Sequence, residues 1–158
     1  MKYIIAVLIL LTLSGCADKE KLVSSSGTPE ALVKCTDEKK VRIAVKLWIA
    51  ESGYFLVRDK YDFILFRKPE EGLGVSVSNM MSKAVNPANP SKNYYEAECR
   101  FTTAGDSTRV TVTLFKSRVD AFGNRESEMV TDMEEIEKFK EEIMLPMKKM
   151  VEGECSSK

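Results

Sequence analysis

Two segments, YYEAECRFT at residues 94–102 and TRVTVTLFKSR at residues 108–118, decide the fold. Successive side chains of a strand point to opposite faces of a sheet, so alternating apolar and polar residues indicate a strand with one buried face. In the second segment, one face carries Val110, Val112 and Leu114, and the other carries arginine and threonine. The segments are joined by AGDS at residues 104–107, which is typical of a turn. We therefore predict a long antiparallel hairpin.

The same alternation sorts the side chains of the first segment into an inner and an outer row. The inner row is Tyr95, Ala97, Cys99 and Phe101, and the outer row is Tyr94, Glu96, Glu98 and Arg100. The outer row, continued by Thr111 and Thr113, predicts a solvated face with an exposed charge ladder. Met80 and Met81 lie at the edge of a loop predicted over residues 80–93, where apolar side chains indicate an exposed hydrophobic patch that could contact a partner. We take both as candidate contact surfaces.

Helices are predicted on either side of the strands. Residues 36–52 form the first helix, with Thr36 as the expected N-cap and Gly53 just past the end. They place Val41, Ala44, Val45 and Trp48 on one helical face, with Leu47 and Ile49 widening it. Residues 132–152 form the second helix, and Thr131 with Glu134 fits a capping box. Pro146 falls inside this second pattern, where it removes a hydrogen bond and should kink or split the helix.

Further strands are predicted between the first helix and the long hairpin. Residues 54–57 and 61–68 flank a short turn, and residues 73–79 form a weaker candidate that two glycines interrupt. A helix, a run of antiparallel strands and a final helix together indicate the α+β class. We expect a two-layer sandwich, in which an antiparallel sheet of four or five strands carries the N-terminal and C-terminal helices on one face.

The N-terminus begins with Lys2 and an uncharged apolar run, Tyr3–Leu13, which is followed by Leu13-Ser14-Gly15-Cys16. As a helix the run would span roughly 16 Å, about half of a hydrocarbon core of about 30 Å, so it is too short for a comfortable transmembrane helix. It instead has the composition of a cleaved signal. A plain secretory peptide with an incidental cysteine, or a short membrane anchor, is the alternative.

Residues 1–16 resemble a bacterial lipoprotein signal with its lipobox. The resemblance implies cleavage between Gly15 and Cys16, a diacylglyceryl group on the Cys16 sulfur, and acylation of the new amine. Ala17 rather than aspartate follows the cysteine. In a Gram-negative cell this implies an outer-membrane lipoprotein facing the periplasm, and in a Gram-positive cell a domain on the cell surface. The rest of the chain resembles no family that we can name.

The predicted organisation has three parts. Residues 1–15 form the signal peptide, residues 16–34 a lipidated flexible tether, and residues 35–158 a single α+β periplasmic domain. The tether assignment follows from the run of serines and from Gly27 and Pro29. Its alternative is that Ala31–Val33 docks as a short strand.

Three cysteines remain after Cys16 is assigned to lipid, and an oxidising compartment permits a disulfide. Cys99 points into the predicted core and should behave as a small buried apolar residue. Cys35 and Cys155 flank the folded region, so a bridge between them would tie its ends together. The alternative is that all three thiols are free.

Composition excludes several classes of function. The chain has 24 basic and 24 acidic residues, and this balance argues against a nucleic-acid partner. It has no histidine, which excludes Ser-His and Cys-His nucleophile pairs, and no Cys-x-x-Cys spacing, so we expect no metal and no cofactor. Glu96 and Glu98 lie about 7 Å apart along one strand face, within the range of glycosidase carboxylates. An ordinary charge ladder is the preferred interpretation, and we assign no catalytic residue.

The sequence thus indicates a membrane-anchored envelope lipoprotein with a non-enzymatic binding or scaffolding domain. Its expected partners are the membrane, through the lipid, and another envelope protein. The alternative is a small apolar-ligand or lipid binder with a pocket between the helices and the sheet, since methionines line the C-terminal helix. A carboxylate hydrolase is a third hypothesis, and the sequence does not indicate the oligomeric state.

Overall fold

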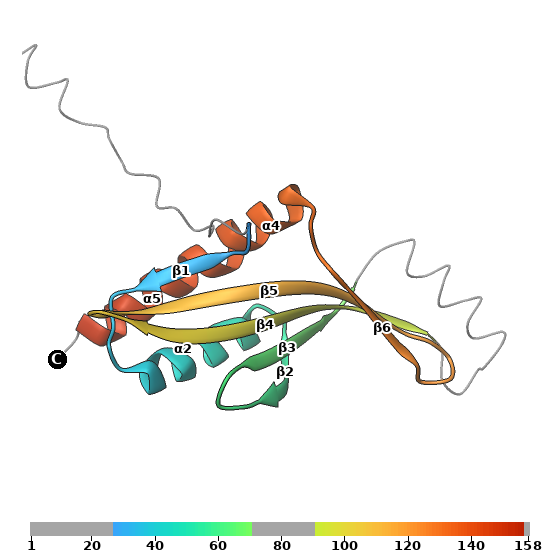
Figure 1. Ribbon diagram of the computed structural model, residues 1–158, viewed down its shortest axis with the longest axis horizontal. Coiled ribbons are helices and arrows are strands. Elements are labelled where there is room, and N and C mark those ends of the chain that lie inside the picture. Colours follow the sequence, from blue (N-terminus) through green and yellow to red (C-terminus); the bar gives the residue numbers. More distant parts are fainter. Residues whose placement is uncertain (1–26, 71–90, 157–158) are drawn as a thin grey trace, which may run out of the picture.

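A computed structural model of the chain describes residues 27–70 and 91–156. Its elements, in chain order, are β1 (Glu30–Val33), α2 (Glu38–Glu51), β2 (Phe55–Asp59), β3 (Ile64–Pro69), β4 (Lys92–Ala104), β5 (Ser107–Val119), β6 (Arg125–Met129), α4 (Met133–Phe139), the π-helical turn η1 (Lys140–Met144) and α5 (Leu145–Ser156). Figure 1 shows their arrangement. The α+β class is confirmed, with a sheet of six strands.

Several predictions fall outside the described residues. They are the signal peptide, the cleavage site at Gly15 and Cys16 with its lipidation, most of the tether, the strand over 73–79 and the pair Met80 and Met81. In the part of the chain that the structure does describe, no helix has the length and apolarity needed to cross a membrane.

The predicted hairpin is the centre of the sheet. β4 and β5 pair antiparallel along thirteen residues each, from Lys92 opposite Val119 to Ala104 opposite Ser107. The strand order is β1-β5-β4-β3-β2, with β6 also paired to β5. β1 pairs with β5 along Thr108–Thr111, and β6 pairs with the same edge of β5 along Phe115–Val119. Two short strands therefore share one edge of β5 in succession.

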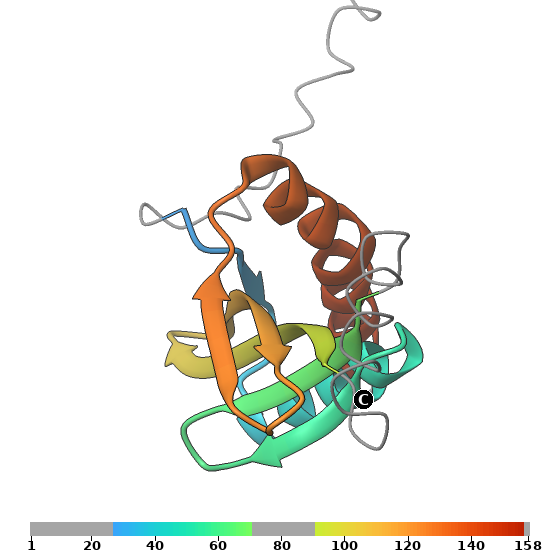
Figure 2. The same cartoon turned by 90° about the vertical axis from the view of Figure 1, so that its right-hand side faces the viewer.

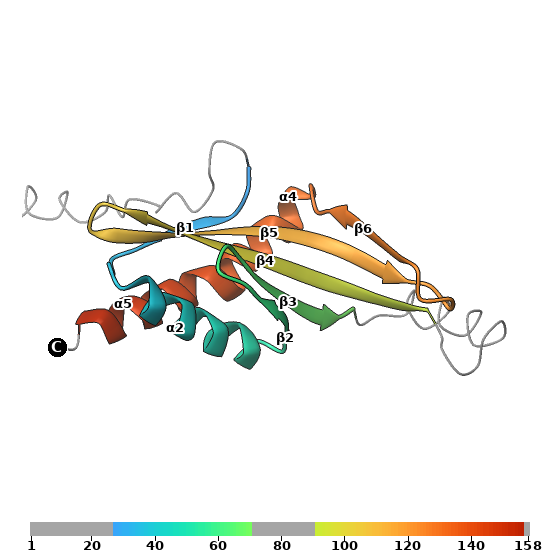
Figure 3. The same cartoon turned by 60° about the horizontal axis from the view of Figure 1, so that its bottom comes forward.

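Both helical segments lie on one side of this sheet, as predicted (Figure 3). The core between them consists of side chains less than 10% exposed from β1, α2, β3, β4, β5 and the C-terminal helix. Its largest fully buried members are Phe66, Ile49, Ile64, Met144 and Met147. The inner row of β4 was assigned correctly at its centre, since Ala97 and Cys99 are both inaccessible. Burial raises the pKa of the Cys99 thiol to about 12.

The N-cap residue of helix α2 lies one position later than expected. Asp37, not Thr36, caps it, because an Asp37 carboxylate oxygen accepts a hydrogen bond from the Lys40 amide at 3.2 Å. Gly53 ends the helix with a φ of +86°, the conformation predicted for that position. The apolar stripe is narrower than expected, since Ile49 is buried but Leu47 is 58% exposed.

The C-terminal helix starts from Asp132 rather than Thr131, and an Asp132 carboxylate oxygen accepts from the Glu134 amide at 2.9 Å. Pro146 is the second residue of α5 and lies directly after the π turn, so the helical backbone continues from α4 to α5 with a change of hydrogen-bond pattern where the sequence predicted a kink or a split. One extra residue in a turn rotates the following helix by roughly 100°. The Trp48 indole donates to the Ile143 carbonyl within this turn at 3.0 Å, which pins α2 to the C-terminal helix.

The predicted disulfide is present. Cys35 and Cys155 are bonded, with Cα atoms 5.8 Å apart and 120 residues of separation. Cys155 lies inside the last turn of α5 rather than beyond the helix. Neighbouring contacts support the junction, since the Lys34 amide donates to the Glu152 carboxylate at 2.9 Å and the Thr108 hydroxyl to the Cys35 carbonyl at 2.7 Å. The two ends of the domain are thereby joined.

The tether prediction extended too far, because residues 30–33 form β1. Ala31 and Val33 are fully buried, and the strand pairs with β5. The alternative of a short docked strand was therefore correct. Four residues with two inward side chains are too short for a periodic pattern to stand out, and the strand exists because the β5 edge is available to pair with it.

Candidate functional site

The candidate site is the sheet face that carries no helix, which we call the open face. Figure 2, viewed from the end of the sheet where β6 lies, shows the C-terminal helix on only one side of the strands. The strand registers place the outer row of β4, extended by Lys92, on this open face. They add Arg109, Thr111, Thr113, Phe115 and Ser117 of β5, Leu65 and Arg67 of β3, Phe55 and Arg58 of β2, Glu30 and Leu32 of β1, and Arg125, Ser127 and Met129 of β6.

Glu96 is buried on the open face, which corrects the prediction of an exposed charge. Glu96 is 1% exposed, and its carboxylate accepts hydrogen bonds from three side chains, one on each of three other strands. Arg67 Nε donates to Glu96 Oε1 at 2.7 Å, and Ser117 Oγ donates to Oε2 at 2.7 Å. An Arg125 guanidinium nitrogen also donates to Oε2. We call Glu96, Arg67, Ser117, Arg125 and Ser127 the Glu96 cluster.

The strand registers explain why this cluster forms. Arg67 of β3 lies directly opposite Glu96, and Ser117 of β5 lies directly opposite Ser127 of β6. Ser117 Oγ and Ser127 Oγ are 2.8 Å apart, and Arg125 Nε donates to Ser127 Oγ at 3.2 Å. A buried charge is tolerated only when it is paired and hydrogen-bonded. The cluster therefore ties β3, β4, β5 and β6 together and is a structural centre rather than a free contact.

Glu98 and Arg100 form a second, more exposed pair within β4. Arg100 Nε donates to Glu98 Oε1 at 2.8 Å, and the Arg100 side chain is 55% exposed. The Arg100 guanidinium also lies over the Phe63 ring at 5.8 Å, as the Arg67 guanidinium lies over the Tyr94 ring at 4.8 Å. Such stacking holds a guanidinium in place while its edge remains available for hydrogen bonds.

The open face is more basic than the chain as a whole. Its strand positions carry six cationic side chains, Arg58, Arg67, Lys92, Arg100, Arg109 and Arg125, against three anionic ones, Glu30, Glu96 and Glu98. The full sequence is balanced at 24 of each sign. Within residues 27–70 and 91–156, Arg58 and Arg109 take part in no ion pair.

Apolar side chains on the open face are spread toward its edges. Leu32, Phe55 and Met129 are each about half exposed, at 48%, 46% and 52%. They belong to β1, β2 and β6, the short outer strands, whereas β4 and β5 contribute mainly threonine and charged residues to the middle, together with the part-buried rings of Tyr94 and Phe115. The centre of the face is therefore mainly polar, with two aromatic rings in it.

The geometry gives little support to the hydrolase hypothesis. The Glu96 and Glu98 carboxylates both accept hydrogen bonds from arginines, and Glu96 is covered. Glu96 cannot reach a substrate without breaking these contacts, which engage both of its carboxylate oxygens. Among the described residues, no group of three or more aspartate, glutamate or cysteine side chains is placed to hold a metal ion.

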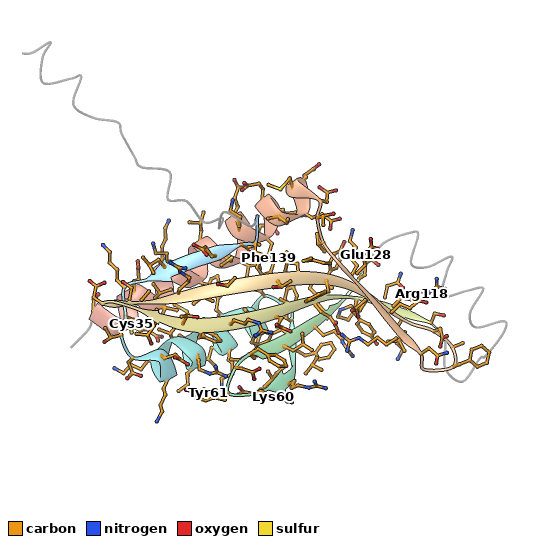
Figure 4. All side chains as sticks on the ribbon, in the orientation of Figure 1. Cys35, Lys60, Tyr61, Arg118, Glu128 and Phe139 are labelled. Atoms are coloured by element: carbon orange, nitrogen blue, oxygen red, sulfur yellow. A yellow bond between two sulfur atoms is a disulfide. The ribbon has the colours of Figure 1, made fainter. Side chains whose placement is uncertain are left out.

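One hollow in the described part of the chain lies away from the helix–sheet core. A shallow, open depression of about 380 Å³ is lined by nine residues at the β6 end of the sheet: Glu70, Asn93, Tyr94, Lys116, Ser117, Arg118, Glu126, Ser127 and Glu128. Arg118 and Glu128 of this set lie far along the sheet from Cys35 (Figure 4). The residues that line the depression are all polar or charged, and it lies outside the apolar core that packs between the helices and the sheet.

Sequence reasoning identified Tyr94, Glu96, Glu98 and Arg100 as one row but missed their partners. β6 was unassigned because all five of its residues are exposed and show no apolar alternation. The turn before it held the available signal, since Asp120, Gly123 and Asn124 are turn residues directly after a clear strand. Comparison with protein-family models, curated proteins and solved structures finds no match for this chain.

Proposed function

We propose that this chain is a membrane-anchored envelope lipoprotein whose domain is a non-enzymatic binding or scaffolding module. The lipobox resemblance at Leu13–Cys16 supports the anchor and an outer-membrane, periplasm-facing location. The disulfide between Cys35 and Cys155 is consistent with an oxidising compartment. The domain would bind another envelope component through its open face.

The observation that supports this function is that one face of the six-stranded sheet is covered by helices and the other, the open face, is not. The Glu96 cluster fixes four strands on that face, and two arginines are stacked on aromatic rings there. Arginine, aromatic residues and methionine are enriched in protein contact surfaces, and lysine is depleted. The open face follows this composition, with five arginines and one lysine at its strand positions.

A site-specific photocrosslinker tests the surface in cells. The photoreactive residue replaces Thr113, in the middle of the open face, or Lys39, on the exposed side of α2 in the opposite layer. We expect an adduct with a protein or with a lipid from position 113, and no such adduct from position 39. Identical adduct patterns from both positions, or neither a protein nor a lipid adduct from position 113, would rule out the open face as the contact surface.

Mass spectrometry of the purified mature protein tests the anchor separately. We expect a triacylated or diacylated Cys16 as the first residue, and a Cys16→Ser variant that no longer fractionates with membranes. An unmodified Cys16 thiol, or an intact leader, would contradict the lipoprotein assignment.

A further inference from the structure

We infer that the component bound by the open face is the anionic lipid surface of the membrane that holds the anchor. This inference rests on the proposed function and names its partner. Three features support it: the sign of the charge on the open face, the mainly polar centre of that face, and the small number of residues between Cys16, the proposed site of the lipid, and β1.

The charge on the open face complements anionic headgroups. Six cationic side chains oppose three anionic ones there, while the sequence as a whole is neutral, so the excess is a property of this face. Arg67 and Arg125 share the charge of Glu96, and Arg100 is paired with Glu98. Arg58 and Arg109 take part in no ion pair within the described residues, so their charges face outward uncompensated.

The distribution of apolar side chains favours a lipid surface over a protein partner. Protein interfaces concentrate their binding energy in a well-packed central cluster. Here the half-exposed Leu32, Phe55 and Met129 lie on the outer strands, and the middle strands present threonine, arginine and glutamate around the part-buried rings of Tyr94 and Phe115. A surface of this kind gains from the summed charge of a headgroup layer, to which each nearby lysine or arginine contributes about 1 kcal/mol.

The anchor supplies the proximity that a weak electrostatic contact needs. Eleven residues, Ala17–Gly27, separate Cys16 from Thr28, the residue two before β1 begins. Fully extended, they reach at most about 40 Å. β1 is itself a strand of the sheet that bears the open face, so the anchor keeps this face within reach of the bilayer. Tethering raises the local concentration of the second contact without adding to its intrinsic strength.

Vesicle binding by the complete mature chain tests the inference. The chain carries Cys16→Ser, so that no lipid anchors it, and is mixed at low salt with vesicles of phosphatidylethanolamine and phosphatidylglycerol or of phosphatidylcholine alone. We expect stronger binding to the phosphatidylglycerol vesicles, and loss of that binding at high salt because the Debye length shortens to about 3 Å at 1 M.

A matched pair of variants separates the open face from net charge. Arg58→Gln with Arg109→Gln removes two charges from the open face, and Lys39→Gln with Lys40→Gln removes two from the exposed side of α2. We expect the first variant to weaken binding roughly fivefold per arginine, and the second to leave it nearly unchanged. Circular dichroism checks that both variants are folded.

Two outcomes would overturn the inference. One is equal binding to the two kinds of vesicle, and the other is an equal loss in the two variants, which would show that only net charge matters. If vesicles show no preference and the Thr113 photocrosslinker captures a defined protein in cells, the proposed function stands and the lipid partner is excluded. If neither method detects contact at the open face, the proposed function fails as well.

Discussion

The two faces of the sheet solve the problem of burial in opposite ways. The helix-covered face buries Ile64, Phe66 and Cys99, which are fully inaccessible and apolar. The open face buries Glu96 to nearly the same degree, but surrounds it with two arginines and a serine. Apolar contacts are non-directional, whereas a buried charge demands partners in fixed positions.

The two faces therefore contribute differently: the apolar face contributes mainly to stability, and the Glu96 cluster mainly to how the strands are arranged. The apolar side would tolerate side chains of similar volume, because packing depends mainly on size and pattern. The Glu96 cluster requires particular residues from four strands, and it therefore ties β6 to the registers of β3, β4 and β5. The helix-covered face should dominate the free energy of unfolding, and the open face should decide where β6 lies.

Removal of the disulfide should lower the free energy of unfolding more than any other change considered. The bond joins the chain after β1 to α5, so it belongs to the helix-covered side of the sheet. The double variant Cys35→Ser with Cys155→Ser frees a loop of 120 residues, which the chain-entropy model values at about 5 kcal/mol. Urea unfolding measures the loss, with the Cys99→Ala variant as a control that keeps the bridge. A loss below about 1 kcal/mol would show that the junction of β1 and α5 holds without it.

Loss of the Glu96 carboxylate should come second. Glu96→Ala leaves Arg67, whose side chain is only 18% exposed, without its partner, and removing one member of a buried pair costs about 3–5 kcal/mol. Urea unfolding again provides the measurement. Backbone hydrogen exchange should show β6 losing protection before β3.

The neighbouring Glu98→Ala is the matched control for Glu96→Ala. Its partner Arg100 is 55% exposed, and pairs of that kind contribute about 0–1 kcal/mol. If the two glutamate variants lose equal stability, the open face does not contain a buried ionic centre, and its contrast with the helix-covered face disappears.

A polar atom placed in the apolar core should have a smaller effect than loss of the Glu96 carboxylate. Cys99→Ser puts a hydroxyl in a fully buried site among apolar side chains, which costs about 1–3 kcal/mol when the group finds no partner. Cys99→Ala, compared with it by thermal unfolding, should lose less. Equal stability of the serine variant and the parent would show that this face also accommodates polar groups.

The smallest effect on the free energy of unfolding should come from the exposed ion pairs that Asp59 of β2 forms with Arg42 and Lys46 of α2. This effect depends on pH. Hydrogen bonds from Lys46 and Arg42 hold the pKa of Asp59 below its ordinary value. A lowered folded-state pKa contributes stability that is complete above the ordinary value, near 3.9, and is lost as the pH falls through the folded value. Asp59→Asn should therefore lose less urea resistance between pH 5 and pH 3 than the parent.

Solvent screening limits the Asp59 effect to below about 1 kcal/mol, since the side chain is 38% exposed. Two-state urea curves at several pH values measure it. A steeper acid dependence in the variant than in the parent would contradict the assigned direction.

The parts of the fold that could be predicted from sequence are those in which local pattern and tertiary environment agree. Val110, Val112 and Leu114 alternate strictly, so the long hairpin was evident, and so was the inward direction of Cys99. Asp37 took the cap expected of Thr36 because neighbouring residues of equal capping ability cannot be ranked by type alone. The boundaries shifted, but the elements remained.

Elements that exist only through their neighbours could not be predicted. β6 has five exposed residues and forms because the β5 edge beyond β1 is open to it. Leu47 matched the apolar stripe of α2 and is exposed, because the sheet and α5 cover only part of the helix circumference. Glu96 matched an exposed ladder and is buried, because Arg67 and Arg125 come from strands 29 residues away on either side.

By itself, the sequence determined the α+β class, the central hairpin and the two amphipathic helices, and it favoured the pairing of Cys35 with Cys155 that the structure contains. These features can be inferred from the spacing of apolar residues, from local composition and from the positions of the cysteines along the chain. Only the tertiary structure decided that Glu96 is buried, that β1 and β6 share one edge of β5, and that basic side chains gather on one face. Burial and charge distribution depend on which distant residues meet, and no local pattern encodes that meeting.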